Sequence, residues 1–508
     1  MTAIQKTSWK AGVSLFVAIL LISALVFWLA PGMQKTSKKP LGLTQADYAL
    51  VSKDCWFTAS EDVVTVCGEL LTPSASGQFR LPYVILSDTS SQRRPDPVIY
   101  LQGGPGGAAG MDQEGIAYWA AWREGTGLQR DLILFDIRGA GMSQPALTCA
   151  NYDRFTLRAL RENLTMEDEL AQGFAVINDC FTALSSQGFS IEQYGTQLSA
   201  QDLHALMSLL SERNPDYKQW NLVGVSYGSR LAMATASGLA TVRALILDSA
   251  YPAGYGGAQS WPGIFDQAMQ RFFSWCEKNT DCNPTSRTDL LQLLALSLQQ
   301  LKDHPIELSL RRWNGEAPVN LVLNDHRFLS AVFFALYSPH DWVHLVPAME
   351  GLASGDRKQL NSLMESFINN ALSDDFNGLV FMAVDCRDHP VQSQDEYQGQ
   401  LEKFPLFAEY MQHLWTYQAC HLFPAGGGLP PMDTPTQPAL ILAGELDPIT
   451  PVEWAETLHA QWPRSQLVRF SETGHAVINH QPCVYSNLGQ YLDDPERAFS
   501  VCANSNNP

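Results

Sequence analysis

The sequence predicts an α/β domain with a mostly parallel sheet. Short apolar runs recur along the chain, and helical segments fall between the later runs. Such runs are expected for strands that a parallel sheet buries on both faces. Alternation of these strands with helices is typical of an α/β architecture.

The predicted strands come in chain order, the first two within a segment that follows Cys55. Their residue ranges are 63–71, 79–86, 97–101, 131–135, 220–223, 242–247, 438–443 and 466–470. Helices are predicted at 200–213, before the fifth strand, and at 230–239, directly after it.

The strand pattern is interrupted between residues 253 and 432. Leucines recur there at helical spacing on one face, at Leu290, Leu291, Leu294, Leu298 and Leu301. Segments 328–337 and 342–352 indicate further helices, and Asn314-Gly315 before 319–323 indicates a hairpin. We therefore expect a mainly helical cap domain at 253–432, inserted before the penultimate strand. The core domain would then comprise 46–252 and 433–508.

The composition is that of a globular protein. The chain has 508 residues, of which 45% are hydrophobic and 17% charged, and its net charge is −19. Nucleic acid is not an expected partner, because phosphate binding needs clustered Lys and Arg.

The N-terminal part, residues 1–45, indicates export. Residues 11–30 carry no charge and follow Lys6 and Lys10. The run is longer than the core of a signal peptide, and bulky Phe27, Trp28 and Leu29 occupy the place of a small-residue cleavage site. An uncleaved signal anchor is favoured over a cleaved peptide, and the membrane is expected as a partner only through this segment.

Ten cysteines behind such a segment indicate disulfides in an oxidising compartment. No C-x-x-C pair suggests a zinc or redox motif. Connectivity does not follow from sequence, and pairing in chain order is the hypothesis: Cys55–Cys67, Cys149–Cys180, Cys276–Cys282, Cys386–Cys420 and Cys483–Cys502.

The sequence Gly224-Val225-Ser226-Tyr227-Gly228 follows the strand 220–223 and precedes a helix. A G-x-S-x-G motif in this context is typical of a nucleophile elbow, in which a strained turn exposes the serine hydroxyl. Small neighbours are needed on both sides of the turn, and Gly224 and Gly228 supply them.

An activated serine needs a histidine as base and an acid that orients the histidine. In α/β-hydrolases both follow the serine along the chain, the acid before the histidine. Asp447 follows the strand 438–443, and His475 follows the strand 466–470. Asp248 and Glu445 compete for the role of acid, and Asp447 is favoured because its strand directly precedes the histidine loop.

A glycine-rich stretch, Gly103 to Gly107, directly follows the strand 97–101. Its backbone could supply one donor of an oxyanion hole, and the amide of Tyr227 the other. A phosphate-binding loop is the alternative, but G-K-S/T and G-x-G-x-x-G spacings are missing. No ligand spacing such as H-E-x-x-H indicates a catalytic metal, and no cofactor is expected.

Several motifs together resemble the proline iminopeptidase and tripeptidyl aminopeptidase family of serine peptidases. They are the G-G-P-G-G loop at 103–107, the D-x-R-G-x-G-x-S loop at 136–143 and the G-x-S-Y-G elbow. GELDPITP, SQLVRF and SETGHA, followed by Cys483 and Cys502, resemble a tripeptidyl-aminopeptidase-type C-terminal region. The resemblance spans residues 50–505.

The resemblance implies an α/β-hydrolase fold and a role for each matching residue. Ser226 would attack, His475 would shuttle the proton and Asp447 would orient the histidine. Gly104 matches the family's oxyanion donor, with Tyr227 as the second. Gln102 stands where the commonest form of the loop has histidine, which leaves the hydrogen bonding of the loop open.

The resemblance further implies short peptides with a free N-terminus as substrates. Binding an ammonium group needs a carboxylate in the cap. The segment 383–388 resembles the family's acid two residues after cysteine, so Asp388 is the candidate, with Asp385 behind it. The alternatives are a carboxylic ester hydrolase and a non-catalytic interaction module on the same fold.

Overall fold

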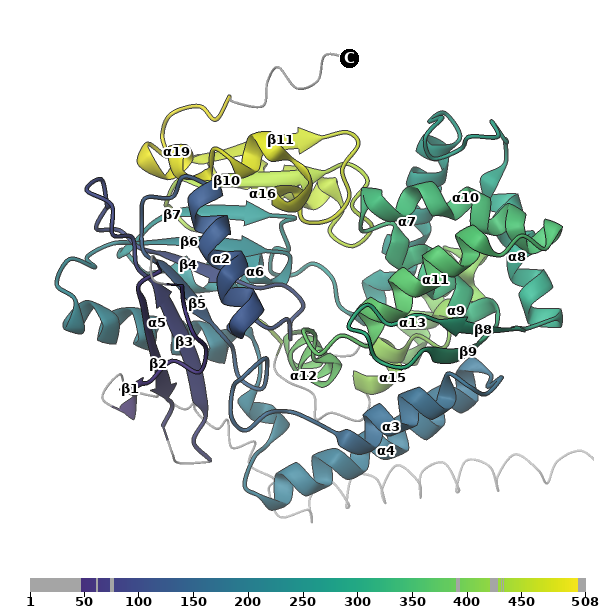
Figure 1. Ribbon diagram of the computed structural model, residues 1–508, viewed down its shortest axis with the longest axis horizontal. Helices are drawn as coiled ribbons and strands as arrows, with labels where there is room; N and C mark the ends of the chain where they lie inside the picture. The colour runs from purple at the N-terminus through teal and green to yellow at the C-terminus, as the bar shows by residue number, and fades with distance from the viewer. Residues whose placement is uncertain are drawn as a thin grey trace, which may run out of the picture. The chain divides into compact units, whose positions relative to one another are not determined.

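The computed structural model describes residues 47–500, without residues 61–62, 74–76, 390–392, 421–427, 431 and 433. In this part of the chain nine strands form one sheet, in the order β1-β2-β3-β5-β4-β6-β7-β10-β11 (Figure 1). The strands of this sheet are β1 Ala49–Lys53, β2 Thr65–Leu71, β3 Arg80–Leu86, β4 Val98–Leu101, β5 Leu132–Phe135, β6 Trp220–Val225, β7 Val242–Asp248, β10 Ala439–Gly444 and β11 Ser465–Phe470.

The sheet has an antiparallel edge and a parallel remainder. Strands β1, β2, β3 and β5 pair antiparallel, whereas β5, β4, β6, β7, β10 and β11 pair parallel. All residues of β4, β5, β6 and β10 are buried, as expected for strands covered on both faces. The predicted α/β class is confirmed, and the parallel strands begin or end within two residues of their predicted positions.

Helices of the core pack against this sheet. The elbow helix α6 contacts β6 and also packs against α5, while α16 packs against β10 and β11. The helices outside the insertion are α2 Gln113–Gly125, α3 Ala150–Ala159, α4 Met166–Ser186, α5 Thr196–Arg213, α6 Tyr227–Ala236, α16 Val452–Gln461, α17 Val477–His480, α18 Pro482–Tyr485 and α19 Leu488–Asp493.

A mainly helical insertion separates β7 from β10, although these two strands are direct neighbours in the sheet. It contains one hairpin, β8 Ile306–Leu310 and β9 Val319–Leu323, as the sequence predicts. Its helices are α7 Trp261–Cys276, α8 Leu290–Asp303, α9 Asp325–Ala335, α10 Pro339–Ser354, α11 Lys358–Ala371, α12 Gly378–Asp388, α13 Gln394–Leu401, α14 Ala408–Met411 and α15 Trp415–Cys420. The structure therefore has a mainly helical insertion before the penultimate strand, and the role of this insertion as a cap domain stays a prediction.

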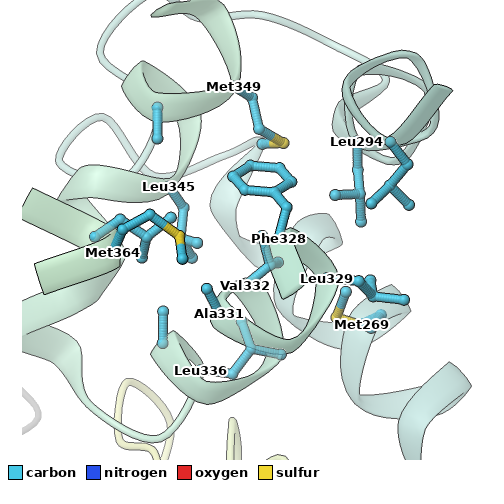
Figure 2. Close-up of a cluster of buried hydrophobic side chains, with 14 of the residues drawn as sticks. Met269, Leu294, Phe328, Leu329, Ala331, Val332, Leu336, Leu345, Met349 and Met364 are labelled. Carbon is cyan, nitrogen blue, oxygen red and sulfur yellow. The ribbon is translucent and has the colours of Figure 1, made fainter. Parts of the chain in front are cut away.

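The insertion has a hydrophobic core of its own, separate from the cluster that covers the sheet. Phe328 and Val332 of α9 lie at its centre, between Leu294 of α8, Leu345 of α10 and Met364 of α11 (Figure 2). Burial of such side chains contributes about 1.5–3 kcal/mol each, which explains how the insertion holds a fixed shape.

The helices α3 and α4 precede the insertion in sequence but pack against it. Arg327 of α9 donates hydrogen bonds to the carbonyl oxygens of Ala159 and Glu162 and to the Glu169 carboxylate. Val322 donates its backbone N–H to the Leu160 carbonyl at 2.7 Å. This pair of helices therefore extends the cap beyond the stretch that interrupts the strand pattern.

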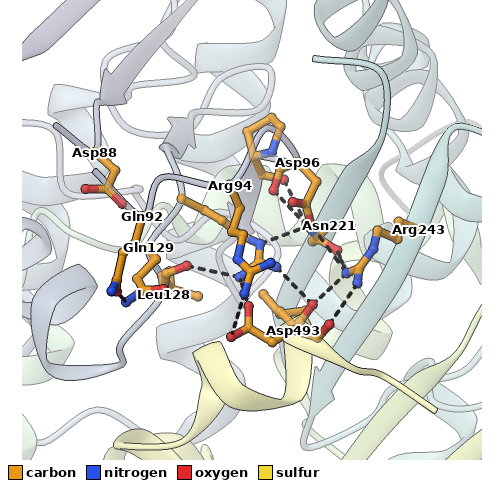
Figure 3. A network of polar contacts seen from close by, with 12 residues as sticks. Asp88, Gln92, Arg94, Asp96, Leu128, Gln129, Asn221, Arg243 and Asp493 are labelled. Atoms are coloured by element: carbon orange, nitrogen blue, oxygen red, sulfur yellow. Dashed lines mark hydrogen bonds and ion pairs between the residues drawn. The ribbon is translucent and has the colours of Figure 1, made fainter. Parts of the chain in front are cut away.

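A polar network ties together the starts of the parallel strands, at the edge opposite the elbow. Asn221 at the start of β6 donates to Asp96, and Arg243 at the start of β7 donates to Asn221 (Figure 3). Buried Arg130 bridges Asp96 and Asp493 with two ion pairs of 3.0 Å. Charge-assisted bonds of this kind fix the strands relative to the C-terminal helix α19.

Four disulfides are present among the described residues: Cys55–Cys67, Cys149–Cys180, Cys276–Cys282 and Cys386–Cys420. They match four of the five hypothesised pairs, and Cys502 of the fifth pair lies outside the described residues. Disulfides of this number are typical of proteins outside the reducing cytoplasm.

The predicted apolar segment at 11–30 also lies outside the described residues. Within the described ranges, no helix combines the length and apolar character that crossing a membrane requires.

Candidate functional site

Ser226 occupies a strained turn between β6 and α6. Its backbone angles are φ 56° and ψ −123°, a conformation that side-chain-bearing residues adopt rarely. The turn is tight: a Cβ on Gly224 would lie 2.3 Å from the Gly228 carbonyl, and one on Gly228 would lie 1.9 Å from the Leu101 carbonyl. Only glycine fits at these two positions, which is the reason for the G-x-S-x-G spacing.

His475 and Asp447 form a buried hydrogen-bonded pair. Nδ1 of His475 lies 2.8 Å from Oδ2 of Asp447. Asp447 follows β10 and also accepts hydrogen bonds from the backbone N–H groups of Ile449 and Thr450, each at 2.9 Å. Burial alone would lower the pKa of His475, but the Asp447 charge and hydrogen bond outweigh it and raise the pKa. Burial opposes ionisation of Asp447, yet His475 and the backbone donors keep its pKa below the usual range.

The two competing acids have partners other than the His475 ring. Asp248 accepts the backbone N–H groups of Val477 and Ile478, each at 2.8 Å, and so binds the start of α17 rather than the His475 ring. Burial raises the pKa of Asp248 to about 6, against the effect of these two donors. Glu445 is half-buried, and its carboxylate lies 3.9 Å from the Arg469 guanidinium.

The loops of Ser226 and His475 meet at Asp248 and Ser249. The backbone N–H of Ser226 donates to the Asp248 carbonyl, and that of Ala476 donates to the Ser249 hydroxyl, both at 2.9 Å. No direct hydrogen bond joins the Ser226 hydroxyl to the His475 ring within the described ranges. Such bonds often form only when substrate binds.

The glycine-rich loop lies against the elbow. A Cβ on Gly103 would lie 3.1 Å from Cβ of Ser226 and 3.7 Å from its hydroxyl oxygen. Gly104 follows with a φ of 116°, which favours glycine. The N–H of Tyr227 opens helix α6, so both predicted oxyanion donors belong to segments that flank Ser226. Gln102 accepts the N–H of Gly103 at 3.3 Å and so takes part in the loop's own hydrogen bonding.

The motif at 136–143 braces this loop from the core. Asp136 accepts the backbone N–H groups of Ala109 and Met142 at 2.7 and 2.8 Å. Arg138 turns away and forms a buried two-pronged ion pair with Asp202 of α5. Neither side chain reaches Ser226, and their contacts are those of a loop clamp.

Two aromatic residues of the insertion lie beside the site. The Tyr337 carbonyl accepts the N–H of His475 at 3.1 Å, and the two rings lie 5.3 Å apart. Phe376 is 46% exposed, and its ring lies 3.2 Å from the position of a Cβ on Gly104. Sequence reasoning missed both residues, since nothing local to them indicates which loops they meet in the fold.

The two acids assigned to substrate binding are both buried. Both carboxylate oxygens of Asp388 accept hydrogen bonds from Thr196, one from its N–H at 3.1 Å and one from its hydroxyl. Asp385 lies one turn earlier on α12 beside His389, with one oxygen unpartnered. Burial raises the pKa of both acids, that of Asp385 to about 7. Their binding of an ammonium group stays a prediction, and the contacts of Asp388 favour a structural role.

The described residues contain no group of three or more His, Cys, Asp or Glu side chains that could hold a metal ion.

Two known proteins are similar to this chain in sequence over most of its length. Serine protease Hip1 of Mycobacterium tuberculosis is 25% identical over 394 residues, which cover 71% of this chain and 72% of the relative. Tripeptidyl aminopeptidase of Streptomyces lividans is 23% identical over 449 residues, covering 82% and 78%. These similarities confirm the family resemblance that the motifs indicate.

Among solved structures, that of proline iminopeptidase from Mycobacterium smegmatis aligns with 84% of this chain and 98% of its own, at 15% identity and a TM-score of 0.37. The family profile described as alpha/beta hydrolase fold matches residues 96–479. The profile covers most of the chain, which therefore belongs to the α/β-hydrolase fold family.

Proposed function

We propose that this hydrolase is an exported serine exopeptidase that releases residues from the free N-terminus of short peptides. The observation that carries the proposal is the placement of Ser226 in a strained elbow beside a glycine-rich loop, in a chain that also pairs His475 with Asp447 at 2.8 Å. The names of its relatives, a tripeptidyl aminopeptidase and a serine protease, support peptides over esters as substrates.

In the proposed reaction Ser226 Oγ attacks the scissile carbonyl carbon while His475 takes its proton. Asp447 holds the imidazole ring and stabilises its charged form. The backbone N–H groups of Gly104 and Tyr227 stabilise the oxyanion, and the start of α6 adds its positive dipole end. His475 then protonates the leaving amine, and water releases the acyl group from Ser226.

The insertion would act as a cap that restricts the site to small or unfolded peptides. Tyr337 and Phe376 come from the insertion and contact the His475 loop and Gly104. A long folded substrate would have to displace these contacts.

Export is supported by the four disulfides, which persist in oxidising compartments. We assign the protein to the periplasm or the extracellular space. Residues 11–30 are the proposed anchor in the membrane.

Mass spectrometry of a peptide mixture digested by the purified protein tests the proposal. We expect release of short N-terminal fragments from peptides with a free N-terminus and none from their acetylated counterparts. Ser226→Ala serves as the matched control and should release nothing. Hydrolysis of short-chain esters without any peptide turnover would replace the peptidase by an esterase, and no turnover of either would favour a non-catalytic module.

A further inference from the structure

Helix α12 is connected to both residues of the proposed oxyanion hole, to Gly104 through the glycine-rich loop and to Tyr227 through Thr196. It belongs to the insertion and lies between the sheet and the remaining insertion helices (Figure 1). At 11 residues it is about 16 Å long, since an α-helix rises about 1.5 Å per residue. The residues at its N-terminal end contact the glycine-rich loop, and its C-terminal end contacts Thr196, which in turn contacts Tyr227.

The N-terminal end of α12 pairs with the glycine-rich loop through the backbone. Ala108 donates its N–H to the Asp375 carbonyl at 2.7 Å, and Asn377 donates its N–H to the Gly106 carbonyl at 3.0 Å. Gly107 and Phe376 form a β-bridge between these bonds. The approach is so close that a Cβ on Gly106 would lie 2.4 Å from the Asn377 carbonyl oxygen.

Asn377 also fixes the start of the helix to the core. Its side-chain oxygen accepts the N–H groups of Leu379 and Val380, at 3.0 and 3.1 Å. Its amide nitrogen donates to the carbonyls of Gly139 and Leu147. An N-cap residue with this many hydrogen-bond partners leaves the start of α12 little freedom to move.

The C-terminal end of α12 reaches Tyr227 through Thr196. The Thr196 hydroxyl lies 2.9 Å from the Tyr227 hydroxyl and also contacts Asp388. A hydroxyl group has one hydrogen, so one order satisfies both contacts: Tyr227 donates to Thr196, and Thr196 donates to the carboxylate. Asp388 and Tyr227 are both buried, which makes an unpartnered group in this chain costly.

A second contact joins the C-terminal end of α12 to helix α6. Arg230, one turn after Tyr227 on α6, lies 2.7 Å from Nε2 of His389, the residue directly after α12. Burial, and then the Arg230 charge, lowers the pKa of His389 to about 3, so its ring is neutral and accepts this bond. The disulfide Cys386–Cys420 further ties α12 to α15.

We propose that α12 sets the separation of the two oxyanion donors, with Asp388 as the positioning residue at Tyr227 and residues 375–377 as the clamp on the loop of Gly104. The proposal rests on the proposed function, and it assigns Asp388 a contact with the elbow instead of with the substrate's ammonium group. Small displacements of oxyanion donors cost catalysis because the donors act only at the right distance.

The test compares substrates with and without an ammonium group. A peptide p-nitroanilide with a free N-terminus carries one, and a p-nitrophenyl ester of a short fatty acid does not. Asp388→Asn, Thr196→Val and Tyr227→Phe each interrupt the chain of hydroxyl groups at a different point. We expect each variant to lower kcat on both substrates by a similar factor, about tenfold, with KM within about twofold.

Thr196→Ser keeps the hydroxyl and should restore most of kcat. Thr182→Val and Asp281→Asn change the same residue types at exposed positions and should leave both activities unchanged. At the other helix end, Gly106→Ala should also lower kcat on both substrates. Thermal unfolding measures whether each variant folds. Tyr227→Phe, which removes a single oxygen atom, decides the outcome if another variant does not fold.

A rise in KM confined to the amine substrate in Asp388→Asn would overturn the proposal and assign this acid to substrate binding. Unchanged kcat in both Thr196→Val and Tyr227→Phe would overturn it as well. A wild-type protein that hydrolyses neither the p-nitroanilide nor the ester would be a different result, which would refute the proposed function itself.

Discussion

Asp447 accepts a hydrogen bond from Nδ1 of His475 at 2.8 Å, and both side chains are buried. Asp248 is equally buried but accepts two backbone N–H groups at the start of α17. The structure thus separates the two acids by their partners: one contacts the imidazole ring and the other the backbone that follows it.

Replacing Asp447 by Asn should lower kcat by about 10³- to 10⁴-fold, because the ring loses the acceptor that orients it and stabilises its charge. Asp248→Asn should cost far less in kcat, since its contacts are with the backbone. Steady-state kinetics on the peptide p-nitroanilide measures both. Equal losses in the two variants would contradict the assignment of the acid.

The activity should fall on the acidic side with the protonation of His475. Its pKa is raised, mainly by Asp447 against the effect of burial, so the ring becomes protonated at a higher pH than an ordinary histidine. A protonated ring cannot accept the Ser226 proton, and kcat/KM should therefore rise with pH through this raised pKa.

In Asp447→Asn the larger of the two charges that raise the pKa of His475 is gone, and burial and the weaker effect of Asp248 remain. The titration midpoint of His475 should therefore move to lower pH. An NMR titration of the histidine rings in the two proteins follows this shift. An unchanged or higher midpoint would show that Asp447 does not control the pKa of His475.

Gly228→Ala should destabilise the protein by about 1–3 kcal/mol or more, because its Cβ would lie 1.9 Å from the Leu101 carbonyl oxygen. Gly399→Ala is the matched control: it lies in helix α13 with nothing within 4 Å of the added Cβ. There alanine should be neutral or stabilise by about 0.5–1 kcal/mol. Urea unfolding of both variants compares them, and equal midpoints would be inconsistent with a tight elbow.

Removal of the Cys149–Cys180 disulfide, by the double replacement with Ser, should lower the free energy of unfolding by about 3–4 kcal/mol. The bond closes a loop with a sequence separation of 31 residues, and its loss frees the unfolded chain.

Peptide mapping under non-reducing conditions should recover Cys483 linked to Cys502. Free thiols at these positions would refute the pairing in chain order.

Much of the sheet follows from local sequence. The strands β4, β6, β7 and β10 are apolar runs with turns at their ends, as expected for strands that a parallel sheet buries on both faces. The strand β1, Ala49–Lys53, was not predicted, because an edge strand with exposed residues carries no apolar pattern. The pairing of α3 and α4 with the insertion was also missed, since packing between distant segments leaves no local signal.

The candidate site likewise contains residues that the local sequence predicts and residues that it does not. Ser226, Asp447 and His475 were predicted because each lies just past a strand, and the carboxyl ends of parallel strands meet at one edge. Phe376 reaches Gly104, and Asp388 reaches Thr196, only through the fold of the insertion. The family resemblance of segment 383–388 singles out Asp388, but it does not indicate the direction of the side chain.

Labelling with a fluorophosphonate probe tests the central claim, that Ser226 is the nucleophile, most directly. We predict one label per chain, located on Ser226 by mass spectrometry, with peptide hydrolysis lost in proportion to the labelling. A folded Ser226→Ala variant should take up no label and hydrolyse no peptide. Labelling of another residue with equal loss of activity, or full peptide hydrolysis by Ser226→Ala, would contradict the account.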